Sequence, residues 1–254
     1  MDKVQLISEI KAFVREKIVE LPFHNFSHTE GVVLSVGEIA KAENVTANEV
    51  SLLQIAAWFH DMGYSATTCC GHELDSVSIA EKYLKGKISS EELAIVKACI
   101  LATQLFATTK TKLEEIISDA DLAHLGKDNF FELTESLRQE KIQIESESDF
   151  TKKEWLVMNL QFLIEHKFKT AYAQEKYEPI KKTRIKEIQE EINALMAKKE
   201  AKKKGKKVND VSLSKPRRDI ETMLRIQARN QMGLSAIADR KASILLSINT
   251  MITS

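Results

Sequence analysis

The chain has little of what builds sheets and tight turns. Only 8 of its 254 residues are Gly and 3 are Pro, and aromatic residues make up 6%. No stretch alternates β-branched or aromatic residues with polar ones in the manner of a half-buried strand. Apolar residues nevertheless make up 43% of the chain, which is enough for a substantial core. We therefore expect an all-α fold, a bundle of helices followed by an extended helical C-terminal region.

Cysteines and long apolar runs are also scarce. Cys69, Cys70 and Cys99 lack the spacing of a zinc or disulfide framework, so we interpret them as core or incidental residues in a reduced, intracellular setting. The N-terminus leads straight into an amphipathic pattern, with no signal peptide expected. No run of about 18 apolar residues is present, so no complete transmembrane helix is expected.

Charge of neither sign predominates overall, but the two signs are unevenly distributed. Residues 1–177 carry 19 basic against 28 acidic side chains, and residues 178–254 carry 18 against 9. An acidic body with a basic extension indicates two modules in different surroundings. Residues 198–207 hold seven lysines, which we interpret as a solvated tether with no nucleic-acid partner. Beside a membrane, the same lysines would attract anionic lipid headgroups.

Apolar residues at spacings of three and four predict a series of amphipathic helices through residues 4–168. The first helix is expected to end near Pro22. Three capping-box patterns predict the starts of later helices: Ser27 to Glu30, Thr46 to Glu49, and Ser89 to Glu92. The first of these boxes places His28 in the first turn of its helix.

Beyond residue 177 the pattern changes. A short heptad seam suited to pairing with another helix, and hence to a homo-oligomer, is formed by Ile185, Ile188, Ile192 and Leu195. The apolar ending at residues 244–252 is too short to span a bilayer. The expected organisation is a helical domain over residues 1–177, a charged helical linker over 178–207 and a helical segment over 208–254.

Three separated segments supply histidine and aspartate at positions expected to face the core: His28, the adjacent pair His60 and Asp61, and Asp121 or Asp119. A buried carboxylate is costly unless it is paired or bound to a metal. Two imidazoles and two carboxylates suit Mn²⁺, Fe²⁺, Ni²⁺ or Mg²⁺ and leave two positions for water or a phosphate oxygen. Asp119 and Asp121 point about 200° apart on a helix, so at most one of them faces the site. The alternative to a metal site is that all four residues are polar core residues without a metal, which would require four independent coincidences.

These segments carry a resemblance to a known family. The motifs are His24-Asn25-Phe26-Ser27-His28, Trp58-Phe59-His60-Asp61-Met62-Gly63 and Asp119-Ala120-Asp121-Leu122. In this order they resemble the HD superfamily of metal-dependent phosphohydrolases, over about residues 20–170. The resemblance implies an HD-domain bundle whose metal ligands are His28, His60, Asp61 and Asp121. Asp121 is preferred to Asp119 because the family's last ligand generally follows a small residue.

The resemblance also implies how the metal is used. A nucleotide phosphoester would be hydrolysed by metal-activated water, with Asp61 or a neighbouring group accepting a proton. His72 matches a family histidine that contacts phosphate or a second metal, although a plain helix-start residue is the alternative. A further family histidine is replaced here by Thr103, which favours one metal ion. His24 and His124 are candidate substrate contacts, with a turn residue as the alternative for His24, and His166 is expected at the surface.

The C-terminal segment carries a second resemblance. Residues 229–249, from Arg229-Asn230-Gln231 to Ser247-Ile248-Asn249, are similar to the start of the membrane domain of Pycsar effectors, a bacterial anti-phage family. This likeness implies a cytoplasmic domain at the inner face of a membrane, with the membrane anchor following residue 254. It also gives a rival function, in which the helical domain senses a cyclic nucleotide and regulates a membrane-disrupting region. A scaffold that oligomerises through the heptad seam is a third possibility.

Overall fold

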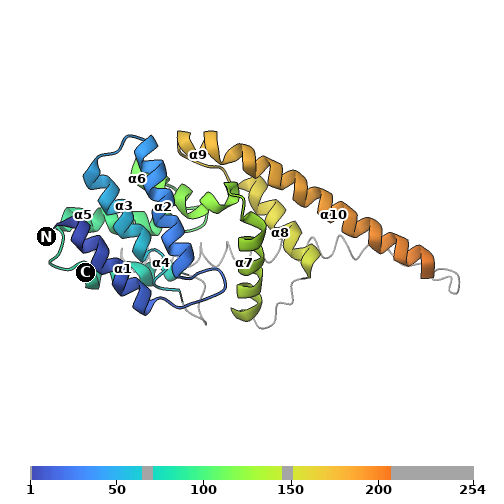
Figure 1. Cartoon of the computed structure of the whole chain (residues 1–254), viewed down its shortest axis with the longest axis horizontal. Helices are drawn as coiled ribbons and strands as arrows, with labels where there is room; N and C mark the ends of the chain where they lie inside the picture. Colours follow the sequence, from blue (N-terminus) through green and yellow to red (C-terminus); the bar gives the residue numbers. More distant parts are fainter. Residues whose placement is uncertain (1, 65–70, 145–150, 207–254) are drawn as a thin grey trace, which may run out of the picture. The chain divides into compact units, whose positions relative to one another are not determined.

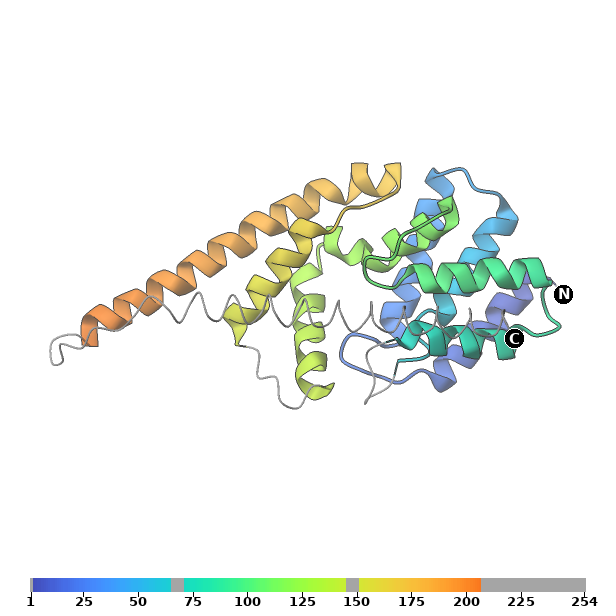
Figure 2. The same cartoon turned by 180° about the vertical axis from the view of Figure 1, so that it is seen from behind.

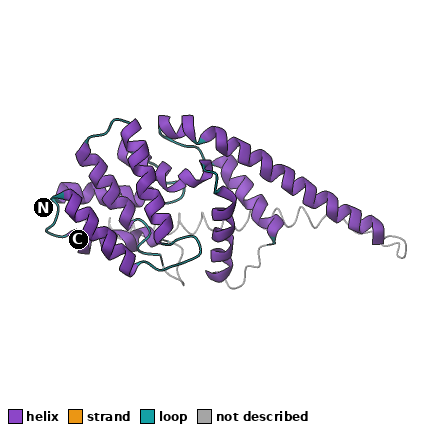
Figure 3. Cartoon of the chain, in the orientation of Figure 1, coloured by secondary structure: helices purple, strands orange, loops and turns teal. Residues whose placement is uncertain are grey.

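Helices are the only regular secondary structure in the described part of the chain. The computed structural model describes residues 2–64, 71–144 and 151–206, and across these ranges it contains ten α-helices, one 3-10 helix and no strand (Figure 3). This confirms the expected all-α class. Within the same ranges, no helix has both the length and the apolar character needed to cross a membrane. The resemblance at residues 229–249 and the pair Cys69 and Cys70 lie outside the described residues.

Six helices form the first part of the fold, with α3 at its centre and the other five around it (Figure 1). They are α1 (Lys3–Lys17), α2 (Phe26–Ala42), α3 (Ala47–Phe59), α4 (His72–Leu84), α5 (Ser90–Ala102) and α6 (Lys112–Asp121). α3 contacts the other five, and residues 55–59 at its C-terminal end are all buried. A helix that is apolar on every side is expected at such a central position. α4 and α5 lie side by side against it, as Figure 2 shows from behind.

The later elements follow in the order η1 (the 3-10 helix Leu122–Gly126), α7 (Phe130–Ile144), α8 (Lys152–Glu165), α9 (Ala171–Lys176) and α10 (Glu178–Lys206). The chain divides into two compact units, Met1–Leu195 and Met196–Ser254. The boundary expected after residue 177 lies inside the first unit, because Tyr177, Ile188 and Ile192 are buried in its core. The heptad seam is therefore largely covered within the chain, and its pairing with a second copy stays a prediction.

Local capping follows the sequence at two of the three expected positions. The capping boxes that begin α3 and α5 are confirmed, with both reciprocal hydrogen bonds present in each. The box expected at Ser27 is wrong, because Asn25 is the N-cap of α2 and its side-chain oxygen accepts from the His28 N–H at 3.0 Å. The Asn25 amide also donates to the Leu21 carbonyl at 3.0 Å, which orders the approach to the helix. His28 still lies in the first turn, as expected. α1 ends at Lys17, earlier than the expected end near Pro22.

Gly63 allows α4 to pack directly on the turn that follows His60. A Cβ atom added at Gly63 would lie 2.2 Å from the His72 carbonyl oxygen and 2.6 Å from the Ser76 amide nitrogen. The Gly63 N–H donates to the Ser76 hydroxyl at 2.8 Å, so the two segments are also hydrogen-bonded. This close approach places the N-terminus of α4, and with it His72, beside the His60–Asp61 turn.

Replacing Gly63 with Ala is expected to lower the free energy of unfolding by about 2 kcal/mol, because overpacking against backbone atoms forces the two segments apart. The matched control is Gly37→Ala in α2, where an added Cβ meets nothing within 4 Å. Since Ala is a better helix former than Gly, the control should gain about 0.5–1 kcal/mol. Urea denaturation of both variants measures the difference. Equal stabilities would contradict the close packing at Gly63.

Candidate metal centre

Helix ends bring together the four residues expected to bind a metal. His28 lies in the first turn of α2, His60 is the C-cap of α3 with Asp61 directly after it, and Asp121 is the last residue of α6. α2, α3 and α6 contact one another, which places these three helix ends together. All four side chains are largely buried, with Asp121 the most exposed at 18%.

The ligand atoms of these residues lie close together. The Nε2 atom of His28 is 3.3 Å from Asp61 Oδ2 and 3.3 Å from Asp121 Oδ1. The Nε2 atom of His60 is 2.9 Å from the same oxygen of Asp61 and 3.5 Å from that of Asp121. The ligand atoms of His28, His60 and Asp121 all lie within 4.8 Å of one another. Ligands about 2.1 Å from a shared ion lie about 3 Å apart in adjacent positions, so these separations fit a single metal centre.

Three of these buried atoms have no hydrogen-bond partner among the described residues: His28 Nε2, His60 Nε2 and Asp61 Oδ2. They lie near one another but are not aligned as hydrogen bonds. Buried polar atoms are nearly always satisfied, so a cluster of unsatisfied ones fits a shared ion. The orientation of His60 fits as well, since its Nδ1–H donates to the Ala57 carbonyl at 2.7 Å and its Nε2 faces the Asp61 carboxylate.

Opposite charges dominate the electrostatics of this centre. Burial alone would lower the pKa of His60, but the Asp61 and Asp121 carboxylates raise it well above its ordinary value. The pKa of His28 is raised in the same way, against the effect of its burial. Conversely, burial would raise the pKa of Asp61, yet the neighbouring imidazoles hold it well below its ordinary range. The protein on its own thus favours ionised carboxylates beside protonated imidazoles, and a divalent cation would replace those protons.

The two aspartates of α6 face opposite surroundings, as the helical geometry predicts. Asp121 lies beside His28 and His60, whereas Asp119 is fully buried in a different environment. The Asp119 carboxylate accepts the Thr170 N–H at 2.7 Å, the Thr170 hydroxyl at 2.8 Å and the Lys169 N–H at 3.0 Å. Asp119 therefore anchors the loop before α9 and has no place among the candidate ligands.

This division predicts opposite effects for Ala at the two positions. Asp119→Ala should lower the free energy of unfolding by about 3 kcal/mol, because buried donors lose a charged acceptor, and should leave Mn²⁺ affinity unchanged. Asp121→Ala should leave the fold intact and weaken Mn²⁺ binding severely. Urea denaturation and calorimetric Mn²⁺ titration of both variants separate the two roles. Loss of Mn²⁺ binding in a folded Asp119→Ala variant would contradict the assignment.

Two further histidines border the centre on one side. The Nε2 atom of His72 is 3.3 Å from Asp61 Oδ1, the oxygen on the other side of that carboxylate. The His24 ring is stacked on Tyr64, with centroids 3.9 Å apart and planes inclined by 17°, and its centroid is 6.2 Å from that of His72. The hydroxyl of Thr103, where a further family histidine was expected, donates to the Ile100 carbonyl at its own helix end.

His124 and His166 occupy different environments. The Nδ1 atom of His124 is 3.2 Å from the Asp121 carbonyl oxygen, and burial lowers the pKa of His124 to about 4. Five of the six histidines therefore gather at this centre. The surface position expected for His166 is wrong, since it is buried and its carbonyl accepts from the buried Lys181 ammonium at 2.6 Å. His166 contributes to the attachment of α10.

Sequence reasoning missed two residues at the centre, Tyr64 and Glu140. Tyr64 directly follows the His60–Gly63 motif, and its aromatic character next to that motif was the available signal. Glu140 of α7 is 1% exposed and contacts His24 across 116 residues of sequence. One glutamate within a charged amphipathic helix gives no sequence signal of this kind.

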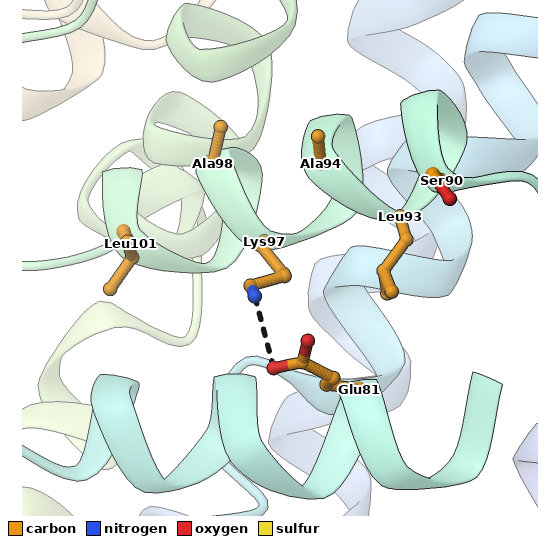
Figure 4. A pocket seen from close by; sticks show the side chains of 7 residues that line it. All are labelled: Glu81, Ser90, Leu93, Ala94, Lys97, Ala98 and Leu101. Atoms are coloured by element: carbon orange, nitrogen blue, oxygen red, sulfur yellow. Dashed lines mark hydrogen bonds and ion pairs between the residues drawn. The ribbon is translucent and has the colours of Figure 1, made fainter. Parts of the chain in front are cut away.

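A separate groove of about 490 Å³ lies between α4 and α5 (Figure 4). It is lined by Glu81, Ser90, Leu93, Ala94, Lys97, Ala98 and Leu101. Across the groove, the Lys97 ammonium of α5 forms an ion pair with the Glu81 carboxylate of α4 at 3.0 Å. None of the lining residues belongs to the histidine and aspartate cluster, so the groove and the candidate metal centre are distinct features.

Comparison with known proteins gives a likeness of fold. No family model and no curated protein match the chain. Among solved structures, a Lactobacillus plantarum protein determined as a structural genomics target is similar, with a TM-score of 0.58 and 12% identity. The match covers 79% of this chain and 100% of that one. At this identity the likeness concerns the helical fold alone.

Proposed function

We propose that the chain is an HD-type, metal-dependent phosphohydrolase that acts on a nucleotide phosphoester. The observation that carries the proposal is the set of unsatisfied, buried ligand atoms on His28, His60 and Asp61, with Asp121 beside them. Two imidazoles and two carboxylates form a donor set suited to Mn²⁺, Fe²⁺, Ni²⁺ or Mg²⁺. A bound divalent cation supplies Lewis acidity, which neutralises phosphoryl charge and lowers the pKa of a coordinated water.

The surrounding side chains divide the remaining tasks. The Oδ2 atom of Asp61 faces His28 and His60, and its Oδ1 atom faces His72. These contacts on both oxygens fix the orientation of the carboxylate. Because its pKa lies well below the ordinary range, Asp61 is a weak proton acceptor. The imidazole of His72 lies at the border of the centre, with Nε2 3.3 Å from Asp61 Oδ1, so we assign proton transfer to His72. His24 and His124 are then available to contact the phosphoryl group or the nucleoside.

The test is a turnover screen of the purified chain with linear and cyclic nucleotides in the presence of Mn²⁺. The proposal predicts metal-dependent release of a hydrolysed product from at least one nucleotide, and no release by the Asp121→Ala variant. Equal release by both proteins would point to a contaminating enzyme and would contradict the proposal.

A second candidate function is favoured by the sequence of residues 229–249, which is similar to the start of a Pycsar effector membrane domain. In this alternative the same centre senses a cyclic nucleotide at the inner face of a membrane, and binding regulates the C-terminal region. It predicts saturable cyclic-nucleotide binding without turnover. Calorimetry on the same nucleotide set, combined with product analysis, distinguishes sensing from hydrolysis.

A further inference from the structure

Glu140 of α7 is a buried carboxylate whose two oxygens are both engaged by the segment that precedes α2. Its Oε2 atom accepts the backbone N–H groups of Phe23 and His24, each at 2.8 Å. Its Oε1 atom contacts Nδ1 of the His24 ring. One side chain from α7 thus fixes both the backbone and the ring of His24.

The charge state of Glu140 determines which nitrogen of His24 carries a proton. Burial alone would raise the pKa of Glu140, but the His24 ring and the two backbone donors hold it below its ordinary value. An ionised carboxylate only accepts hydrogen bonds, so Nδ1 of His24 must be the protonated nitrogen. The other nitrogen, Nε2, can donate to a ligand oxygen when the ring carries a second proton, and the Glu140 carboxylate is the counter-charge of that ring.

The His24 ring borders the candidate metal centre. Its centroid lies 5.6 Å from that of His28, and the ring is stacked on Tyr64, which in turn contacts His72 with centroids 4.4 Å apart. We propose that Glu140 is a positioning residue that holds the His24 ring through Nδ1–H and pairs with the charged form of the ring, whose Nε2–H donates to a phosphoryl group at the metal centre. The identity of that ligand rests on the proposed function, whereas the Glu140–His24 pairing does not. The inference makes α7, which lies outside the six-helix arrangement around α3, a part of the functional site.

The test uses Glu140→Gln in the full chain, because Gln preserves size and changes only the hydrogen-bonding groups. Two backbone N–H groups need the remaining oxygen of Gln, which turns its NH₂ group toward Nδ1 of His24. The His24 ring should then switch tautomer, with Nδ1 unprotonated and Nε2 protonated. Imidazole ¹⁵N chemical shifts of the metal-free protein report this switch, and His24→Asn assigns the signals. The control is Glu135→Gln, on the same helix, whose carboxylate pairs with Arg138.

The functional readout is the affinity of the Mn²⁺-loaded protein for inorganic phosphate, measured by calorimetry. Glu140→Gln should bind phosphate at least about 10-fold more weakly, because the neutral Gln cannot pair with the charged His24 ring and the uncharged ring attracts phosphate less. Its Mn²⁺ affinity should equal that of the wild type, and Glu135→Gln should change neither property. An unchanged His24 tautomer, or unchanged phosphate affinity despite a switched tautomer, would overturn the inference. If the wild type bound no Mn²⁺, the proposed function would fail, and the ¹⁵N measurement would still decide the pairing.

Discussion

Replacing Asp61 with Ala is expected to abolish both divalent-metal binding and nucleotide hydrolysis. The change removes an oxygen that lies 3.3 Å from His28 Nε2 and 2.9 Å from His60 Nε2. It also removes a negative charge beside both imidazoles, so a bound divalent cation would lose one of its two carboxylate counter-charges. Mn²⁺ affinity should fall by more than about 100-fold, beyond the 10–100-fold cost of losing a partner that only orients a ligand. Calorimetric titration and nucleotide turnover measure the two losses.

The matched control for Asp61→Ala is Asp75→Ala, which removes an exposed acid from the first turn of α4. It changes the net charge equally and should leave metal binding and turnover at wild-type levels. Asp61→Asn, which keeps the shape of the side chain, separates loss of charge from loss of packing. Full turnover by folded Asp61→Ala protein would refute the proposed chemistry.

The stabilisation of the protein by Mn²⁺ is expected to increase as the pH rises above about 6.5, the ordinary pKa of histidine. Without metal, the raised pKa of His60 and His28 contributes stability below that pH, and this contribution is lost as the pH rises through their folded-state pKa values. Metal binding needs the imidazoles unprotonated, so protons and Mn²⁺ compete for the same nitrogens. The melting temperature of the metal-free protein should therefore fall over this range while the shift caused by Mn²⁺ grows.

The size of that shift follows from mass action. Mn²⁺ at 100 times its dissociation constant stabilises the fold by about 2.7 kcal/mol, which for a chain of this size corresponds to roughly 5–10 °C. His124 and His166 do not interfere, because burial lowers their pKa values to about 4 and about 3 and their effects lie below pH 6.5. Differential scanning calorimetry between pH 6.5 and 8.5 measures the trend, with Asp121→Ala as the control without a complete site. A Mn²⁺ shift that is larger at the lower pH would contradict the competition.

Features that depend on neighbours along the chain could be predicted from the sequence. The capping boxes at Thr46 and Ser89 satisfy backbone groups three residues away, and both formed as expected. The opposite directions of Asp119 and Asp121 follow from the pitch of one helix. At α2, two local signals competed, and Asn25 prevailed over Ser27 because its amide also binds the Leu21 carbonyl while its oxygen caps the helix.

Features that depend on packing between distant helices could not be predicted in this way. The burial of His166 depends on Lys181 of α10. The Lys181 ammonium donates to the His166 carbonyl and forms an ion pair with the Glu178 carboxylate. The pairing of Glu140 with His24 depends on where α7 packs. The spacing of apolar residues within α7 does not show that position. The motif order placed the candidate ligands correctly near helix ends, but the residues that orient the surrounding histidines required the three-dimensional structure.

The most direct test of the central claim is anomalous diffraction at the manganese edge from crystals of the chain grown with Mn²⁺. The account predicts one strong anomalous peak per chain within bonding distance of His28 Nε2, His60 Nε2 and the Asp61 and Asp121 carboxylates. A peak bound by other residues, or no peak at a Mn²⁺ concentration that saturates the protein in solution, would contradict it.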